Sequence, residues 1–184
     1  MLPDGATYHS DFINEVEEQV LLSEIDNNPW CADLKRRVQH YGYRYDYAAG
    51  GISAVDFLGR LPVWLDCIIA RLVDCGYFCH LPDQAIINEY LPGQGITSHV
   101  DCGTCFGERI ASLSLGSGCE MKFSAQRTDV TLAKYLAPRS LLHMAGPARW
   151  NWTHAIPARK SDIVSGQRMF RDRRVSVTFR NVTP

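Results

Sequence analysis

The sequence lacks the features that would place the chain in a membrane or an export pathway. Its 184 residues contain no apolar run long enough to cross a bilayer. The first residues, Met1 to Glu15, do not show the basic and then apolar order of a secretory signal. We therefore expect a cytoplasmic protein that has no membrane partner.

Internal repeats and low-complexity stretches are also absent, and the chain carries little net charge. Because this charge is −1, long-range attraction to nucleic acid is weak and any such binding depends on local basic patches. Hydrophobic residues make up 46% and charged residues 21%, which is typical of a globular domain. The length predicts one domain over residues 1–184, and we expect a monomer.

The cysteines are odd in number and no secretory signal accompanies them. The seven residues are Cys31, Cys67, Cys75, Cys79, Cys102, Cys105 and Cys119. This predicts reduced thiols rather than a disulfide framework. The Cys102-Gly103-Thr104-Cys105 run has the spacing of a zinc or redox pair, but no second ligand pair follows nearby. We therefore expect no metal or redox role for it.

Two helices are predicted in the first 84 residues, where helical periodicity appears in 11–25 and 61–73. The apolar side of the first consists of Val16, Val20, Leu21 and Ile25. The apolar side of the second consists of Leu65, Ile68, Ile69 and Leu72. Both helices are interpreted as packing elements that cover the rest of the domain.

A basic and aromatic segment lies between these helices, over residues 34–47. Arg37 and its basic neighbours precede alternating tyrosines that could line one face of a strand, namely Tyr41, Tyr43, Tyr45 and Tyr47. Cations interleaved with aromatic rings suit unstacked bases. A half-buried strand with its tyrosines in the core is an equally good interpretation. The glycine-containing run 48–53 that follows resembles a lid loop.

From Gln84 onward the pattern changes to short strands separated by Gly, Pro and polar clusters. The predicted strands are 85–90, 96–100, 110–115, 120–124, 130–136, 140–144 and 174–180. This spacing predicts a jelly roll or barrel. The expected fold is α+β, with helices and a lid over about 1–84 and a β core over about 85–184.

His99 and Asp101 are two residues apart in a predicted strand, so their side chains project from one face. An imidazole and a carboxylate directed at one point provide two of the three ligands of a non-haem iron(II) site. A second histidine downstream would complete the set. His143 and His154 are the candidates, and the spacing favours His154 without excluding His143.

The last strand alternates between polar and apolar residues. Its polar face consists of Arg174, Ser176, Thr178 and Arg180. Because a buried guanidinium needs a partner, two arginines inside a small barrel predict a bound anion, and a dicarboxylate would suit them. A solvent-exposed edge strand is the alternative. Asn88 and Tyr90 alternate in the same way one strand before the metal pair, and both can donate hydrogen bonds to a carboxylate.

These motifs together resemble the AlkB-type iron(II)/2-oxoglutarate dioxygenases. The matching segments are 87–90, 92–96, 99–101, 112–117, 138–142, 152–154 and 174–180. The resemblance covers most of the chain and implies a double-stranded β-helix beneath a nucleotide-recognition lid. The segment 34–42 is also similar to the branch of the family that hydroxylates a modified wobble uridine in tRNA.

The resemblance implies a role for each matching residue. The implied iron ligands are His99, Asp101 and His154, which are also the catalytic residues. The implied 2-oxoglutarate ligands are Asn88, Tyr90, Arg174, Ser176 and Arg180. The cofactors are then Fe(II), 2-oxoglutarate and O2. The substrate is an alkylated base in DNA or RNA, single-stranded or flipped out.

The chemistry implied is oxidative dealkylation, which yields succinate, CO2 and formaldehyde. Two alternatives are hydroxylation of a tRNA wobble uridine and hydroxylation of a protein side chain; a non-catalytic ligand-binding jelly roll is a third. The expected substrate-binding residues are Arg37, Tyr41, Tyr43, Tyr45 and Gly103. Gly103 occupies the position where repair enzymes of the family often carry an acidic residue that reads the base. The basic residues of 159–160 and 168–174 are further candidates for phosphate contacts.

Overall fold

The computed structural model of the protein describes residues 1–32 and 34–183. The strands of its larger sheet are β1 (Ala6–His9), β2 (Val38–Tyr41), β3 (Gln84–Tyr90), β5 (Phe106–Gly116), β8 (Leu141–Met144) and β12 (Arg174–Val182). Those of its smaller sheet are β4 (Ile96–His99), β6 (Cys119–Ala125), β7 (Thr131–Leu136) and β9 (Trp152–Ile156). The helices are α1 (Glu15–Asp26), η1 (Ala54–Asp56), η2 (Val63–Leu65), α2 (Asp66–Asp74) and α3 (Gly146–Trp150).

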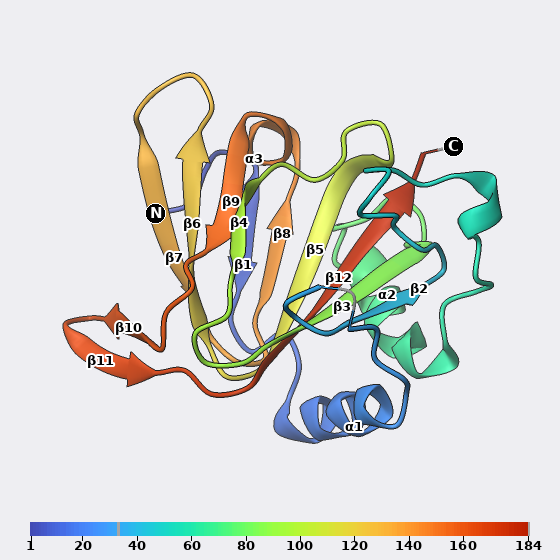
Figure 1. Cartoon of the computed structure of the whole chain (residues 1–184), viewed down its shortest axis with the longest axis horizontal. Helices are drawn as coiled ribbons and strands as arrows, with labels where there is room; N and C mark the ends of the chain where they lie inside the picture. Colours follow the sequence, from blue (N-terminus) through green and yellow to red (C-terminus); the bar gives the residue numbers. More distant parts are fainter. Residues whose placement is uncertain (33, 184) are drawn as a thin grey trace.

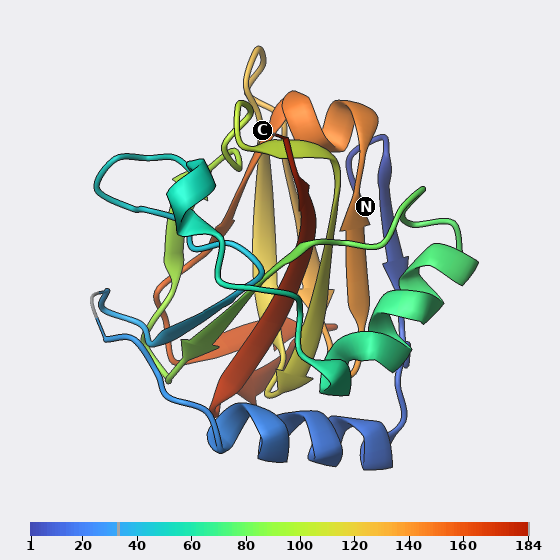
Figure 2. The same cartoon turned by 90° about the vertical axis from the view of Figure 1, so that its right-hand side faces the viewer.

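The two sheets face each other, and α1 and α2 cover the outer side of the larger one (Figures 1 and 2). Strand order is β1-β8-β5-β12-β3-β2 in the larger sheet and β4-β9-β6-β7 in the smaller, with antiparallel pairing throughout. A hairpin of β10 (Ser161–Val164) and β11 (Gln167–Phe170) projects from one end. The predicted double-stranded β-helix is confirmed.

Strand β12 lies in the middle of the larger sheet, between β3 and β5. Its apolar side chains, Val175, Val177 and Phe179, are fully buried against the helices. Its polar side chains line the space between the sheets. The predicted division of this strand into two faces is therefore confirmed, and it is a central strand rather than an exposed edge.

The second predicted helix is confirmed as η2 followed by α2, with its whole predicted apolar side buried. The predicted core face of the first helix is wrong in part. Val16 and Val20 are 69% and 54% exposed, whereas Glu18 is buried with Leu21 and Ile25. Glu18 can be buried because its carboxylate accepts a hydrogen bond from the Gly116 amide and pairs with a guanidinium, that of Arg139.

The predicted strand of alternating tyrosines ends early, because β2 stops at Tyr41. Gly42 follows with φ +76°, and a Cβ there would lie 1.8 Å from the Asp83 carbonyl oxygen. Only glycine fits this turn. The later tyrosines therefore belong to the loop that follows β2 and not to one strand face.

Among the described residues, no helix is both long and apolar enough to cross a membrane.

Candidate active site

Two connected hollows lie between the sheets, and we name them the outer and the inner cavity. The outer cavity, of about 340 Å³, is lined by residues before and after β2, and by Thr97, Cys102 and Phe106 near the ends of β4 and β5. The residues that flank β2 are Leu34, Arg36, Tyr45 and Tyr47. The inner cavity, of about 50 Å³, extends between the sheets towards Arg174. Both cavities are lined by Asn88, Ile96, His99, Asp101 and Arg180.

Three potential metal ligands meet where the cavities join. Strands β4 and β9 pair so that His99 lies directly opposite His154, with ring centroids 4.4 Å apart. Asp101 follows β4, and its Oδ1 lies 3.4 Å from His99 Nε2 and 3.6 Å from His154 Nε2. One ligand atom from each residue falls within 4.8 Å of the others. The three can therefore converge on a single ion.

His143, the other candidate, lies elsewhere in the structure. It is buried in β8 against the rings of Tyr77 and Phe78. Burial lowers its pKa to about 4. The structure thus brings His154 to the His99 and Asp101 pair and leaves His143 in the packing between strand and loop.

The electrostatics of the triad favour an ionised Asp101 carboxylate and a neutral His154 imidazole. Burial by itself would raise the pKa of Asp101, but the Arg180 guanidinium and the two histidines hold this pKa well below its usual range. Arg180 Nε donates to Asp101 Oδ2 at 2.8 Å. Burial lowers the pKa of His154 to about 4. A deprotonated carboxylate and neutral imidazole nitrogens are the forms that bind a metal ion.

Arg174 supplies a second, independent sign of a ligand. It is 2% exposed, and one of its guanidinium nitrogens, Nη2, donates to Ser114 Oγ at 2.9 Å. Its Nε and Nη1 are buried without a hydrogen-bond partner in the described part of the chain. Tyr90 lies beside this guanidinium, and Ser176 lines the same cavity. Unpaired donors on a buried cation suit a carboxylate ligand.

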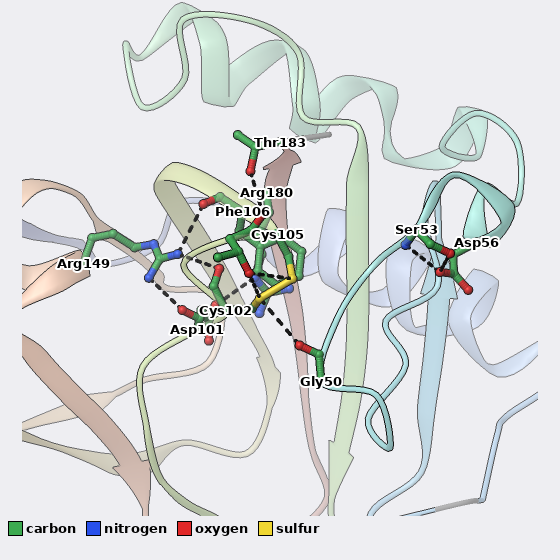
Figure 3. The surroundings of a disulfide bond; sticks show 11 residues. Gly50, Ser53, Asp56, Asp101, Cys102, Cys105, Phe106, Arg149, Arg180 and Thr183 are labelled. Carbon is green, nitrogen blue, oxygen red and sulfur yellow. Dashed lines mark hydrogen bonds and ion pairs between the residues drawn. A yellow bond between two sulfur atoms is a disulfide. The ribbon is translucent and has the colours of Figure 1, made fainter.

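Another buried arginine, Arg149 of α3, holds the chain immediately after the triad carboxylate. Its guanidinium donates to the carbonyl oxygens of Asp101, Cys102 and Phe106 at 3.0–3.4 Å (Figure 3). It also donates to the carbonyl oxygen of Gly107 at 3.2 Å. Sequence reasoning missed this residue, because carbonyl acceptors leave no signal in the sequence.

The prediction that all cysteines are reduced thiols is wrong for one pair. Cys102 and Cys105 form a disulfide within the turn that Arg149 holds (Figure 3). The turn brings their Cα atoms to 5.4 Å, which is within the usual range for such a bond. Cys102 also lies 3.8 Å, Sγ to oxygen, from the carbonyl of Gly50 in the lid loop.

The predicted substrate-binding residues divide into two groups. Tyr45 lines the outer cavity and stacks on Phe106, with ring centroids 5.8 Å apart. Tyr41 packs on Trp64, Tyr43 contacts Phe57, and Arg37 forms a two-point ion pair with Glu89. None of these last three, nor Gly103, is among the residues that line the outer cavity. Arg36 and Tyr47, which were not singled out as site residues, do line it.

Most of the basic residues proposed for phosphate contacts already have partners. Arg159 and Arg171 both bind the carboxylate of Asp162, and Arg173 bridges Glu89 and Asp26. These guanidinium groups stabilise the base of the hairpin and the edge of the sheet. They are therefore less available to a nucleic acid than the sequence indicated.

Comparisons with known proteins agree with this geometry. The family model described as 2OG-Fe(II) oxygenase superfamily matches residues 8–180. Protein L905 of Acanthamoeba polyphaga mimivirus is 35% identical over 180 residues, with 97% of this chain and 85% of that protein covered. The ALKBH8 homologue of Arabidopsis thaliana, named an alkylated DNA repair protein, is 37% identical and covers 94% of this chain. Mouse ALKBH8, named a tRNA (carboxymethyluridine(34)-5-O)-methyltransferase, is 38% identical and covers 92%.

The chain spans only 56% of the Arabidopsis protein and 27% of the mouse protein. Among solved structures, OsALKBH1 superposes with a TM-score of 0.77 at 14% identity, covering 98% of both chains. A prolyl-4-hydroxylase from Pseudomonas putida gives a TM-score of 0.61 at 17% identity, covering 96% of this chain and 92% of that one. At these identities the likeness is one of fold.

The fold and the site define a dioxygenase of the double-stranded β-helix class, and the chain belongs to the 2OG-Fe(II) oxygenase superfamily. Within that superfamily it is a member of the AlkB family, since it is 30% identical to the mouse alpha-ketoglutarate-dependent dioxygenase alkB homolog 7, with 98% of this chain and 80% of that protein covered. Enzymes of this class use Fe(II), 2-oxoglutarate and O2. The two histidines and the carboxylate fit Fe(II). The unpaired donors of Arg174 fit a carboxylate of 2-oxoglutarate.

Proposed function

We propose that this protein oxidises an alkyl group on a base of DNA or RNA, with the base single-stranded or flipped out. The observation that carries the proposal is the outer cavity, which opens onto the triad and has the aromatic rings of Tyr45, Tyr47 and Phe106 in its wall. Rings of this kind stack on an unpaired base. Relatives named for DNA repair, DNA demethylation and tRNA modification support a nucleic-acid substrate.

Each group in the site has a distinct task in this proposal. Iron, 2-oxoglutarate and O2, when bound, supply the oxidising chemistry. His99, Asp101 and His154 would hold the iron, while Arg174, Tyr90, Asn88, Ser176 and Arg180 would hold the 2-oxoglutarate. The tyrosines of the loop would position the base and exclude water.

The atom that carries the alkyl group determines the product. A methyl group on a ring nitrogen becomes a hydroxymethyl group, whose C–N bond breaks to release formaldehyde and the unmodified base. A carbon attached to a ring carbon keeps its new hydroxyl group. Oxidative dealkylation is our first candidate.

Hydroxylation of a wobble uridine in tRNA is the second candidate. It is favoured by the 38% identity to mouse ALKBH8, whereas the DNA N6-methyl adenine demethylase of Caenorhabditis elegans is 26% identical. Gly103, at the position that is often acidic in repair enzymes, also favours it, since no carboxylate is present there to read a base amino group.

The test is a substrate panel with two readouts. Methylated single-stranded DNA, methylated duplex DNA and total tRNA are each incubated with Fe(II) and 2-oxoglutarate, and both formaldehyde and nucleoside masses are measured. Formaldehyde supports dealkylation, and a gain of one oxygen atom on a tRNA nucleoside supports hydroxylation. Asp101→Ala is the inactive control. If every nucleic acid is inert while a protein substrate gains oxygen, the proposal is wrong.

A further inference from the structure

Arg36 lies at the border between the two cavities. Its Nε donates a hydrogen bond to Asn88 Oδ1 at 2.8 Å. Arg36 lines the outer cavity, and Asn88 lines both cavities. One side chain from the loop before β2 thus connects the wall of the proposed base pocket to a residue of the proposed 2-oxoglutarate pocket.

This hydrogen bond determines which end of the Asn88 amide is free. An asparagine amide has one acceptor, Oδ1, and one donor group, the NH2. Because Oδ1 accepts from Arg36, the NH2 end remains for a ligand, and a carboxylate needs a donor. Asn88 is 7% exposed, so little space is available for the amide to turn.

The local strand pairing explains how Arg36 reaches this position. Strands β2 and β3 pair with Val38 opposite Asn88, and just before β2 the Arg37 carbonyl oxygen accepts a hydrogen bond from the Glu89 amide at 3.0 Å. Arg36 therefore meets Asn88 on the inner face. Its neighbour Arg37 meets Glu89 on the outer face, with two hydrogen bonds of 2.6 and 2.7 Å. The two arginines are adjacent in sequence and contact opposite sides of one strand.

The outer-cavity side of Arg36 contacts the aromatic wall. Its guanidinium carbon lies 6.0 Å from the centroid of the Tyr47 ring. Burial raises the pKa of the Tyr47 hydroxyl, and the nearby Arg36 charge opposes that rise. A group that enters the outer cavity therefore meets the same guanidinium that holds the Asn88 amide.

We propose that Arg36 is a positioning residue for 2-oxoglutarate, which acts by fixing the Asn88 amide with its NH2 towards the inner cavity. Through Arg36, the outer cavity wall and the co-substrate pocket depend on one side chain. This inference rests on 2-oxoglutarate binding, which is a property of the enzyme family. It does not depend on the identity of the base.

The experiment measures 2-oxoglutarate binding without turnover. Mn(II) replaces Fe(II), nucleic acid is left out, and the dissociation constant is measured by calorimetry. We expect Arg36→Met to weaken binding about five- to tenfold, since one hydrogen bond from a charged donor no longer orients the amide. Arg36→Lys should recover part of the loss. In Fe(II) turnover assays, KM for 2-oxoglutarate should rise by a similar factor while kcat changes little.

Two comparisons separate positioning from a general loosening of the loop. Arg37→Met removes the neighbouring arginine and its ion pair, and it should leave 2-oxoglutarate binding within about twofold of wild type. In an Asn88→Ala background, Arg36→Met should weaken binding no further, because the amide that it positions is absent.

Three results would overturn the inference. They are unchanged binding in Arg36→Met, equal losses in Arg36→Met and Arg37→Met, and additive losses with Asn88→Ala. Absence of 2-oxoglutarate binding by the wild-type protein would overturn both this inference and the proposed function. Failure of the base-oxidation assay alone would leave this inference standing.

Discussion

Replacing Arg174 by methionine should remove 2-oxoglutarate binding without destabilising the unliganded protein. The wild-type guanidinium is 2% exposed and has two buried nitrogens without partners in the described structure. Methionine fills similar space and buries no charge. Replacements of buried ion pairs by apolar groups of similar volume are often neutral or stabilising by about 1–4 kcal/mol, and in the described structure the loss of Arg174 leaves no carboxylate without its partner. For a chain of this length, each kcal/mol changes Tm by roughly 2–4 °C.

The effect on the ligand is in the opposite direction. Hydrogen bonds to a charged group contribute about 1.5–3 kcal/mol each, so losing two weakens binding by roughly 10²- to 10⁴-fold. At a 2-oxoglutarate concentration of about 100 times its dissociation constant, the wild-type protein gains about 2.7 kcal/mol. That gain corresponds to an increase in Tm of roughly 5–10 °C. Arg174→Met should show almost none of it.

The assay is thermal unfolding with Mn(II) over a titration of 2-oxoglutarate. A second ligand, 2-oxovalerate, keeps the keto acid and lacks the distant carboxylate. It should therefore bind weakly to the wild-type protein, and its affinity for Arg174→Met should be the same. Arg173→Met is the matched control, since that arginine lies on the surface and pairs with Glu89 and Asp26. Equal 2-oxoglutarate affinity in Arg174→Met and wild type would refute the assignment of this arginine to the carboxylate.

Two further predictions concern the other buried groups. Asp101→Ala should abolish the visible charge-transfer band that Fe(II) and 2-oxoglutarate give without oxygen, and an unchanged band would place the metal elsewhere. His143→Phe should flatten the pH dependence of Tm between pH 6.5 and 4. Burial lowers the pKa of His143 to about 4, so below pH 6.5 the unfolded chain binds a proton that the folded protein does not. This histidine should therefore make wild-type stability fall with decreasing pH, by up to about 3 kcal/mol at pH 4. An equally steep fall in His143→Phe would contradict this account.

Several errors in the sequence interpretation share one physical cause. Glu18 is buried because a backbone amide and an arginine from distant parts of the chain satisfy its carboxylate. Arg173 of the predicted basic cluster binds Glu89 and Asp26, which lie 84 and 147 positions away in the sequence. Charge and periodicity describe a residue and its chain neighbours, whereas burial depends on partners that folding supplies.

The features that the sequence determined by itself are those that depend on short, regular spacing along the chain. Alternation along β12 separated a core face from a polar face. The sequence spacing also brought His99 and Asp101 to one point, although Asp101 lies just after the end of β4. Motif resemblance was enough to indicate the fold. Alternation along a strand can be recognised from the sequence alone, because the strand period of two residues is a property of the backbone.

The spacing favoured His154 over His143 and the resemblance implied it, but the physical reason, the pairing of β9 with β4, appears only in the tertiary structure. The tertiary structure likewise revealed Arg149 on four carbonyl oxygens and Arg36 on the amide of Asn88. Each of these contacts joins residues at least 42 positions apart. Backbone carbonyls and neutral amides carry no charge pattern that would indicate such partners in advance, so three-dimensional packing alone decides which donors they receive.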